Sequence, residues 1–474
     1  VRIPLRLKAG VDVTRQDRDI RNPSPSYNFV GPDRIANTAD DDVARYGIID
    51  TDYSREAPPL GRPSIQWPGP RKLYEIYKQH PEYFSQTVAS MVSTPANNSR
   101  KIIETITSPY LRFDLKFWQN RLGVTGGWRV EHTHNEGEGV LNDIRATYQQ
   151  DAQGNLIRDA AGRLIRISTD PLVIAQAQFQ DRGAHADKSY RTHHPSLNTS
   201  YRFREHLVAR AAYARTIGRP TFGRIIPGVT VTDPDAAERL IRVNNTGLKP
   251  YSADNYDVSL EYYFEPNGQL SLGLFRKDVK DFFGTVRFPA TPELLEEFGL
   301  SDDHLAYEVS TTSNVGDARM TGYEVNYRQA LTFLPTWARG VIVFASFTDT
   351  RPQGARSADF GGTLRRSVNW GVGLSRPRYS MNLNWNFRAK QRGALIGGAN
   401  VPGATYSYQA ARLLLDVSAE YRIRKGLALY ATARNLTNEV QNQQRYNADT
   451  PYYARNFNVI DTGAFFTLGV KGEF

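Results

Sequence analysis

The sequence contains no cysteine, which excludes disulfide frameworks, thiol nucleophiles and cysteine-ligated metals. It also lacks any run of about 18 apolar residues, so no transmembrane helix is expected. No glycine-rich phosphate loop follows a strand pattern, and no serine, histidine and acid stand in the context of a nucleophile. We therefore expect neither an enzyme nor a bound cofactor.

What the sequence does contain is a two-residue alternation of apolar and polar side chains. It covers residues 5–14, 110–117, 256–262, 381–388, 413–420 and 465–474. Successive side chains on a strand point to opposite faces, so each segment predicts a strand with one apolar and one mostly polar face. The residues expected on the apolar face, in contact with lipid, are Leu111, Phe113, Leu115, Leu383, Trp385, Phe387, Leu468 and Val470.

The connections between these segments are short and long in turn. Short connections are expected at 119–120, 204–206, 266–268, 333–335, 376–378 and 424–426. Long connections are expected at 16–103, 134–188, 220–255, 281–319, 351–361, 392–408 and 439–462. Outer-membrane barrels have short periplasmic turns and long extracellular loops, whereas a water-soluble β-sandwich has no reason to sort its loops in this way. The pattern predicts an all-β, antiparallel transmembrane barrel with about fourteen strands of ~10 residues each in this chain.

The polar face and the composition agree with a barrel. Full charges lie on this face in adjacent strands, for example Arg112, Asp114, Arg129 and Glu131, and a dry sandwich core would not tolerate them unpaired. Aromatic residues make up 11% of the chain, enough for girdles at the membrane interfaces. The net charge of +10 is spread without a dense tract, so no nucleic-acid partner is expected. A basic rim suits outer-membrane lipid and lipopolysaccharide.

The long loops are expected to hold some structure. Residues 70–79 predict a short helix that Pro81 ends, and Thr291, Pro292 and Glu293 resemble the N-cap and first turn of another helix. Two clusters could hold a metal: Glu131, His132, His134 and Glu136 where a strand meets a loop, and residues 40–42, three aspartates in a long loop. A polar barrel rim and a solvated loop are the favoured interpretations, so no metal site is expected.

Four motifs resemble those of TonB-dependent outer-membrane receptors. They are Asn435-Leu436-Thr437-Asn438-Glu439 after the penultimate strand, residues 213–222 (YARTIGRPTF), residues 247–257 (GLKPYSADNYD) and residues 321–324 (TGYE). In this order, with strands between them, they are fairly specific for the family. The form of these four motifs is also similar to that of the motifs in the carbohydrate-uptake subgroup of the family.

The resemblance implies a barrel of about 22 strands with a plug in its lumen, preceded by a short energy-coupling box. Neither the box nor the plug is found in the sequence, so residues 1–474 are expected to be the C-terminal portion of the barrel. The plug and first strands would then be cleaved, absent from these residues, or supplied by another chain. Otherwise the fourteen strands would have to close a smaller barrel alone. A TonB-type energy-coupling protein is the implied partner, through the missing N-terminal segment.

Ligand binding is expected at the long-loop end, where aromatic faces can stack on sugar rings or planar chelators and arginines can bind carboxylates. The candidate residues are Trp67, Tyr77, Tyr406, Tyr408, Arg445, Tyr446, Tyr452, Tyr453 and Arg455. Residues 441–456 are favoured because they combine amides, arginines and tyrosines in one loop. The resemblance also implies that the terminal aromatic, Phe474, is the recognition signal for barrel assembly.

Three functions remain open. The chain could belong to a ligand-specific active importer of a scarce nutrient, such as an oligosaccharide or a metal chelate, in the outer membrane of a Gram-negative bacterium. It could instead form a passive porin-like channel, which needs only the barrel. It could also be an adhesion or assembly component on a receptor-like barrel. The presence of a plug and coupling box upstream would separate the first from the others.

Overall fold

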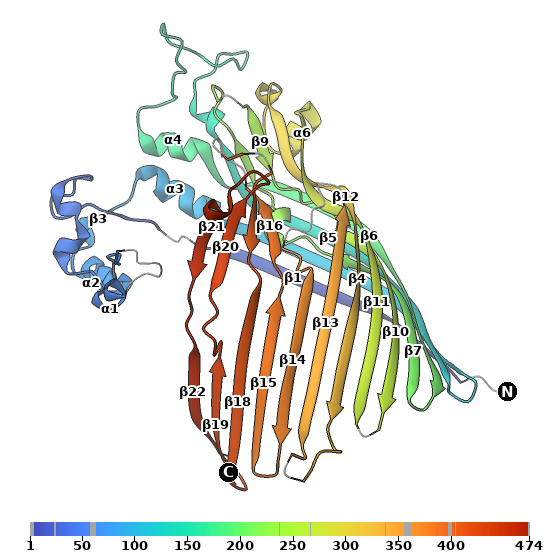
Figure 1. Ribbon diagram of the computed structural model, residues 1–474. Coiled ribbons are helices and arrows are strands. Elements are labelled where there is room, and N and C mark those ends of the chain that lie inside the picture. The colour runs from blue at the N-terminus through green and yellow to red at the C-terminus, as the bar shows by residue number, and fades with distance from the viewer. Residues whose placement is uncertain are drawn as a thin grey trace.

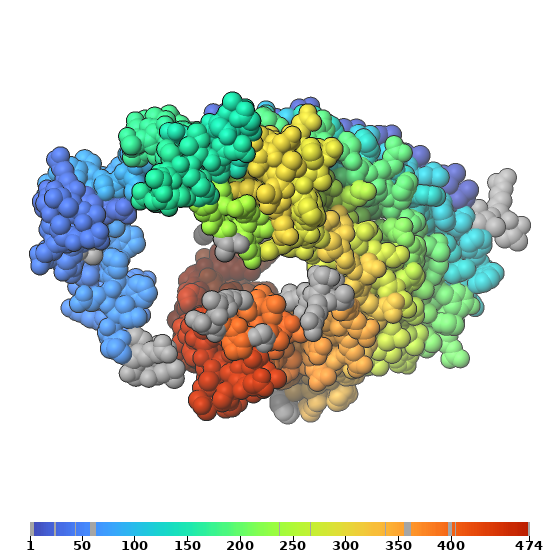
Figure 2. Space-filling model, turned by 90° about the horizontal axis from the view of Figure 1, so that it is seen from above, coloured from blue at the N-terminus to red at the C-terminus, as the bar shows by residue number. Residues whose placement is uncertain are grey.

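The computed structural model describes residues 4–22, 25–56, 63–236, 238–265, 267–336, 338–354, 362–396, 401–402 and 404–472. Over these residues the main feature is a 16-stranded sheet that forms a tall curved wall (Figure 1). Seen from the long-loop end, the wall and its loops surround an open centre (Figure 2). In the part of the chain that the structure describes, no helix is long and apolar enough to cross a membrane.

Fourteen of these strands follow one path, and β8 and β9 lie off it. Neighbours on the path are antiparallel and come in chain order, so the wall is an up-and-down meander. The strands are β1 (Leu5–Arg21), β4 (Ser99–Phe117), β5 (Leu122–Asp143), β6 (Phe179–Arg204), β7 (Leu207–Gly218), β10 (Tyr251–Phe264), β11 (Gly268–Pro289), β12 (Glu308–Ala330), β13 (Val341–Gly354), β14 (Arg366–Ser375), β15 (Tyr379–Arg388), β18 (Arg412–Arg424), β19 (Leu427–Arg434) and β22 (Phe465–Gly472).

The register aligns the apolar positions of neighbouring strands on one face. Directly opposed residues in an antiparallel ladder share a face. One such row runs from β4 to β18 through Phe117, Leu122, Tyr201, Ala209, Leu260, Leu272, Val325, Phe347, Val368, Phe387 and Leu413. The residues predicted to face lipid lie on this face, and Leu468 and Val470 continue it opposite Ala431 and Leu429. The apolar face is therefore one continuous surface.

The opposite face is polar along the same strands. The adjacent row runs through Lys116, Gly123, Ser200, Arg210, Ser259, Gly273, Glu324, Thr348, Ser367, Arg388 and Arg412. Charges on this face pair with one another: Arg112 with Asp114 at 2.8 Å, and Arg210 with Glu261 at 2.8 Å. This arrangement suits a wet face, because each charge keeps a partner or solvent.

Aromatic side chains gather near the short-turn end of the wall. Trp118 contacts Tyr201 at 6.0 Å between ring centroids, and Tyr262 stacks on Phe264 at 5.5 Å. Phe264 in turn lies 6.5 Å from Tyr327 on a neighbouring hairpin. Each of these residues lies within four positions of a short turn. The rings form part of the girdle expected where a barrel wall meets the membrane surface.

The connections at the lower edge of the wall are short, and those at the upper edge are long (Figure 1). Two of the long connections are clearly shorter than the sequence predicts. Residues 134–188 were expected as loop, but β5 continues to Asp143 and β6 begins at Phe179. Likewise, β11 extends to Pro289 and β12 begins at Glu308 within the loop predicted over 281–319. These four strands have 22 to 26 residues, more than twice the ~10 that span a membrane.

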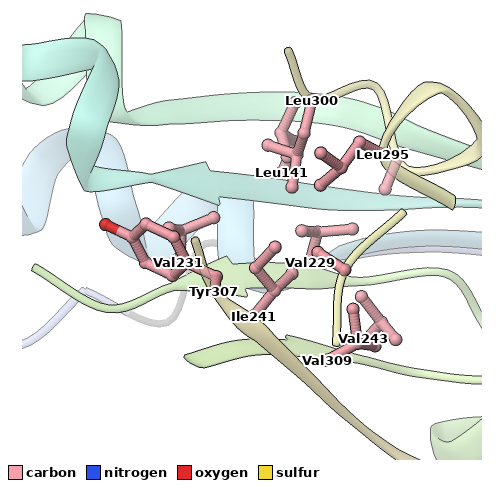
Figure 3. Packing of buried hydrophobic residues seen from close by; sticks show 11 residues of the cluster. Leu141, Val229, Val231, Ile241, Val243, Leu295, Leu300, Tyr307 and Val309 are labelled. Atoms are coloured by element: carbon pink, nitrogen blue, oxygen red, sulfur yellow. The ribbon is translucent and has the colours of Figure 1, made fainter. Parts of the chain in front are cut away.

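The extended strand ends enclose a separate hydrophobic core. The hairpin of β8 (Val229–Val231) and β9 (Leu240–Val243) pairs in parallel with β5 on one side and with β12 on the other. Between them pack Leu141, Val229, Val243, Leu295 and Val309, among others (Figure 3). Ile241, Leu295 and Val309 are fully buried. The hairpin therefore joins two strands, β5 and β12, that are separated by four other strands in the wall.

The helices lie in the long connections. The predicted helix over 70–79 is confirmed as α2 (Pro70–Gln79), and Thr291 caps α6 (Pro292–Glu297) by accepting a bond from the Leu294 N–H at 3.4 Å. The others are α1 (Thr51–Arg55), α3 (Val88–Asn97), α4 (Pro171–Gln178) and α5 (Phe222–Ile225), with short 3-10 helices at Ala39–Asp41, Val43–Tyr46, Pro81–Tyr83, Ile144–Thr147, Asp302–His304 and Tyr452–Ala454.

The connection between β1 and β4 forms a small body beside the wall, labelled by α1, α2 and β3 in Figure 1. Its β2 (Asn28–Phe29) pairs with β3 (Phe84–Ser85). Phe29 packs edge-to-face on Tyr46 at 5.1 Å and on Phe84 at 5.3 Å. Aromatic contacts therefore supply much of the core of this body.

Among the described residues, β1 and β22 each pair with one neighbour only, and they do not pair with each other. The sheet is therefore open, and the smaller closed barrel considered from the sequence does not form. β1 is exposed along nearly its whole length, and Leu468 on β22 is 83% exposed. Both edges present unpaired backbone groups.

Candidate ligand-binding surface

A second, four-stranded sheet continues the C-terminal part of the wall at the long-loop end. Its order is β16 (Gln391–Leu395), β17 (Tyr406–Gln409), β20 (Gln441–Tyr446) and β21 (Asn456–Ile460). These strands extend β15, β18, β19 and β22 in the same order. Each begins or ends within a few residues of the wall strand it extends. The sheet is thus held by four neighbouring wall strands.

Asn435 forms the corner between β19 and β20. It adopts a left-handed backbone conformation, with φ of 51°, which asparagine tolerates better than most residues. Its side-chain N–H groups donate to the carbonyls of Glu439 and Gly463 at 3.1 and 3.2 Å, and its Oδ1 accepts from the Glu439 N–H at 2.8 Å. The motif from Asn435 to Glu439 is therefore a clamp. Its hydrogen bonds fix the chain just before β20 and just after β21.

An aromatic and basic cluster lies on this sheet. Tyr408 and Tyr446 stack with ring centroids 4.1 Å apart and an interplanar angle of 13°. The Lys390 ammonium lies 4.9 Å from the Tyr408 ring centroid and 4.5 Å from that of Tyr446. The Arg455 guanidinium lies 4.7 Å from the Tyr446 centroid. We call the set Lys390, Arg392, Tyr406, Tyr408, Arg445, Tyr446, Tyr452, Arg455 and Phe457 the aromatic–basic cluster.

The remaining members extend the cluster sideways. The Arg392 guanidinium lies 4.7 Å from the Tyr406 ring centroid, and that of Arg445 lies 3.2 Å from Phe457. Cation–π contacts of this kind hold the cations against ring faces. Burial, followed by the proximity of Tyr446, raises the pKa of Tyr408, so its phenol is neutral at pH 7. The cluster therefore combines neutral aromatic faces with four cations.

The structure brings together most of the predicted binding residues. Tyr406, Tyr408, Arg445, Tyr446, Tyr452 and Arg455 lie in the cluster, and Tyr453 lies beside it. Tyr452 and Tyr453 are 82% and 87% exposed, at the tip of the turn between β20 and β21. Such exposed rings are accessible to a ligand from outside.

Trp67 and Tyr77 lie elsewhere, in the body between β1 and β4. Pro68, next to Trp67, forms a β-bridge with Ile49. The Trp67 backbone N–H donates to the Ser54 hydroxyl, and Trp67 is 53% exposed. Tyr77 packs on Tyr27 and Phe84, each at 5.3 Å. These contacts stabilise the body itself, and within the described residues no hydrogen bond or ring contact of Trp67 or Tyr77 reaches the aromatic–basic cluster. Phe474, the proposed assembly signal, lies outside the described residues.

The clusters considered for metals are occupied by other contacts. Glu131 pairs with Arg129 at 2.8 Å and with Arg219, whereas His134 contacts Glu136 at 2.9 Å and Ser189 at 2.9 Å. The carboxylates of Asp40 and Asp41 accept backbone N–H groups of their own turn. Among the described residues, no group of three histidine or acidic side chains is placed to hold a metal ion.

The sequence interpretation missed Lys390, Arg392 and Phe457. The signal was available, because Lys390 and Arg392 are two residues apart at the start of a strand and so share a face. Phe457 is likewise on a strand, directly after the favoured loop. Lys390 and Arg392 alternate along one strand, and Tyr406 and Tyr408 alternate along the next. Together, these two patterns indicate the cluster.

The sequence interpretation also missed an eight-residue repeat, DAQGNLIR at 151–158 and DAAGRLIR at 159–166. Each aspartate caps its own turn, with Asp151 and Asp159 each accepting two backbone N–H groups through Oδ1. Residues Gln149, Ile157 and Ile165, one repeat apart, bond to one another in a triangle. Burial, with the hydrogen bond to Asp233, raises the pKa of the adjacent Tyr148 to about 12.

The comparisons with known proteins come from a family model and from solved structures. The model described as TonB dependent receptor-like, beta-barrel matches residues 4–436. None of the curated proteins compared with the chain matches it. The ferric-catecholate import receptor Fiu of E. coli K12, in its closed form, is 14% identical with a TM-score of 0.56, over 100% of this chain and 52% of Fiu.

A second similar structure is the FrpB iron transporter of Neisseria meningitidis, F3-3 variant. It is 13% identical with a TM-score of 0.50, over 99% of this chain and 52% of FrpB. At such identities the likeness shows the fold alone. The chain spans about half the length of both structures.

Proposed function

Because the chain belongs to the TonB-dependent receptor β-barrel family, we propose that it forms the larger part of the barrel wall of an active importer. Members of this family lie in the outer membrane of Gram-negative bacteria and are transporters rather than enzymes. The importer would bind a scarce ligand at the outer loops and pass it through the lumen when a TonB-type protein moves the plug.

The observation that carries the proposal is the continuous apolar row with a polar row behind it. A wall with these two faces suits lipid on one side and a wet or plugged lumen on the other. Outer-membrane lipid and lipopolysaccharide would cover the apolar face and its aromatic girdle. The paired charges of the polar face, such as Arg210 and Glu261, would line the lumen.

The open edges support a longer receptor. Unpaired backbone groups are not tolerated in the hydrocarbon region, so β1 and β22 need partner strands there. A barrel of about 22 strands would supply them from residues outside this chain. We propose that those strands, the plug and the coupling segment precede the wall in the receptor or come from another chain. The similar structures, about twice as long, fit this proposal.

We propose that the aromatic–basic cluster binds the ligand. Neutral ring faces beside Lys390, Arg392, Arg445 and Arg455 suit a planar anionic ligand, such as a metal chelate, because rings stack and cations neutralise charge. The two similar structures are a ferric-catecholate import receptor and an iron transporter. An oligosaccharide, the other candidate from the sequence, could stack on Tyr408 and Tyr446 but carries no charge to match the cations.

The test is energised uptake by cells that carry the receptor. Replacing Arg445, Tyr452 and Arg455 together by alanine should abolish uptake of a ferric catecholate while the barrel stays folded, as judged by heat-dependent gel mobility. A matched control changes Tyr74 to alanine, an exposed tyrosine of the body between β1 and β4. Unchanged ligand affinity in the triple variant would eliminate the cluster as the binding surface.

The same assay separates import from the alternatives. A protonophore should stop uptake but leave surface binding intact, because only energised transport needs the inner-membrane gradient. Uptake that continues would identify a passive channel. Binding without any uptake, with or without the protonophore, would identify an adhesion or assembly component.

A further inference from the structure

A cavity of about 270 Å³ lies among the extended strand ends, outside the aromatic–basic cluster. Its walls come from β6, the segments around β8 and β9, β11 and α6. The apolar part of its lining includes Ala186, Pro227, Val243, Phe288, Leu294 and Phe298. Pockets for drug-sized ligands usually span ~300–1,000 Å³, so this cavity suits a smaller molecule.

The walls of the cavity are fixed by packing. Val229, Val243 and Ala184 belong to the hydrophobic core shown in Figure 3, and Phe288 and Phe298 pack against it. On the other side, the backbone of Pro227 packs directly against Gly139. A Cβ at Gly139 would collide with the Pro227 carbonyl oxygen, so this close approach needs a glycine. The cavity is thus part of a packed unit.

The polar side chains that line the cavity form hydrogen bonds with nearby backbone carbonyls. Asn244 donates to the Ile226 carbonyl at 2.9 Å, Asn245 to the Thr312 carbonyl at 3.0 Å, and Thr246 to the Ile225 carbonyl at 2.6 Å. The charges that remain at the cavity are Lys188 and Glu297, which pair at 2.7 Å. Both are partly exposed, with 41% and 42% of their side chains accessible.

This ion pair stands between the apolar cavity and a polar one of about 450 Å³. The two cavities share His185, Ala186, Lys188 and Glu297. Four carboxylates line the polar cavity, those of Glu136, Glu138, Asp187 and Glu297, against two lysines, Lys101 and Lys188. Three of these carboxylates have partners outside the cavity, because Glu138 pairs with Arg182 at 3.4 Å and His134 lies 2.9 Å from Glu136 and 3.4 Å from Asp187. Glu297 instead pairs with Lys188, which lines both cavities.

We propose that these adjoining cavities form a second ligand site, which takes a small amphipathic amine. The apolar body would occupy the 270 Å³ cavity, and the ammonium group would bind Glu297 in place of Lys188. Exchange of one cation for another keeps the Glu297 carboxylate paired, and an ion pair this exposed costs little to open. The site lies away from the aromatic–basic cluster, and its occupation does not require transport.

The test is direct binding of tryptamine to the whole receptor in lipid nanodiscs, measured by saturation-transfer NMR, with indole-3-acetate as a probe of similar size and opposite charge. Tryptamine should bind and indole-3-acetate should not. Glu297→Gln should weaken tryptamine binding roughly tenfold, because it removes a charged hydrogen bond. Lys188→Gln should strengthen it, because Glu297 loses its competing partner. Glu296→Gln, a neighbouring charge that lines neither cavity, should change nothing.

Ala186→Leu provides a variant that keeps every charge and narrows the passage shared by the cavities. It should weaken binding of tryptamine and of neutral 3-methylindole alike. Preference for indole-3-acetate, equal losses in Glu296→Gln and Glu297→Gln, or no tryptamine binding at all would overturn the proposal. Because the readout is binding, these results are independent of whether the receptor transports its ligand.

Discussion

At the scale of single residues, the two faces of a strand differ in what a charge would cost. Leu383 pairs with Val372 and Val417 on the apolar face, whereas Asn384 pairs with Gly371 and Asp416 on the polar face. Leu383→Arg should destabilise the folded barrel by roughly 2–4 kcal/mol, because it places a cation in lipid. Asn384→Arg should be mild, since Asp416 is a ready partner. Unfolding in lipid vesicles, followed by heat-dependent mobility, measures both. Equal effects of the two variants would show that the faces are assigned wrongly.

Asn435 provides a second test at this scale. Asn435→Ala removes three side-chain hydrogen bonds at a half-buried corner and leaves an unfavourable left-handed backbone, so it should cost about 1–3 kcal/mol. Asn435→Gly restores the backbone freedom but not the bonds, so its cost should fall between those of Asn435→Ala and the unchanged chain. A denaturant series on the three proteins gives this order. An alanine variant as stable as the parent would mean that the clamp has no energetic role.

At the scale of elements, the β8–β9 hairpin holds the outer unit together. Ile241 is fully buried between β5 and β12, so Ile241→Ala should cost about 2–5 kcal/mol of local stability. Hydrogen exchange over 229–243 should accelerate accordingly, while the wall strands keep their protection. Arg242→Ala, on the exposed side of the same strand, should leave exchange unchanged. Slower or unaltered exchange in Ile241→Ala would show that the hairpin is not a packed element.

Period-two alternation found the membrane-spanning parts of the strands, because there one face contacts lipid and the other water. It failed in the outer half of β5, where residues 134–139 are mostly polar or glycine and show no apolar face. Those residues are extended because they pair with β6. Pro227 packs against Gly137 and Gly139, where a side chain would collide with it. Tertiary pairing decided the conformation, so local patterning could not reveal it.

The aromatic–basic cluster was predictable in part for a related reason. Its tyrosines and arginines lie in one loop region of the sequence, and residue chemistry alone singled out 441–456. The contacts of Tyr446 with Tyr408 and Lys390 depend on the pairing of β17 with β20. This pairing joins residues about 40 positions apart in the sequence. Trp67 and Tyr77 shared the same chemistry, but their packing within another body could not be read from composition.

At the scale of the whole molecule, the last strand, β22, pairs with β19 and forms one edge of the open sheet. We predict that deletion of Phe474 reduces the amount of receptor inserted in the outer membrane without changing the fold of the molecules that insert. The physical reason is that, until the barrel closes, the edge of its last strand presents unpaired backbone groups to the assembly machinery. Quantitative immunoblots of membrane fractions, with Phe465→Ala as a control, measure this. Normal insertion of the deletion variant would remove the role.

The central claim is that one face of the wall contacts lipid and the other contacts water, and a cysteine scan of β15 tests it most directly. These 474 residues contain no cysteine, so single substitutions from 381 to 387 report without background from this part of the receptor. A membrane-impermeant thiol reagent, applied to the receptor in vesicles, should label positions 382, 384 and 386 and spare 381, 383, 385 and 387. Labelling without alternation, or with the opposite phase, would contradict the account.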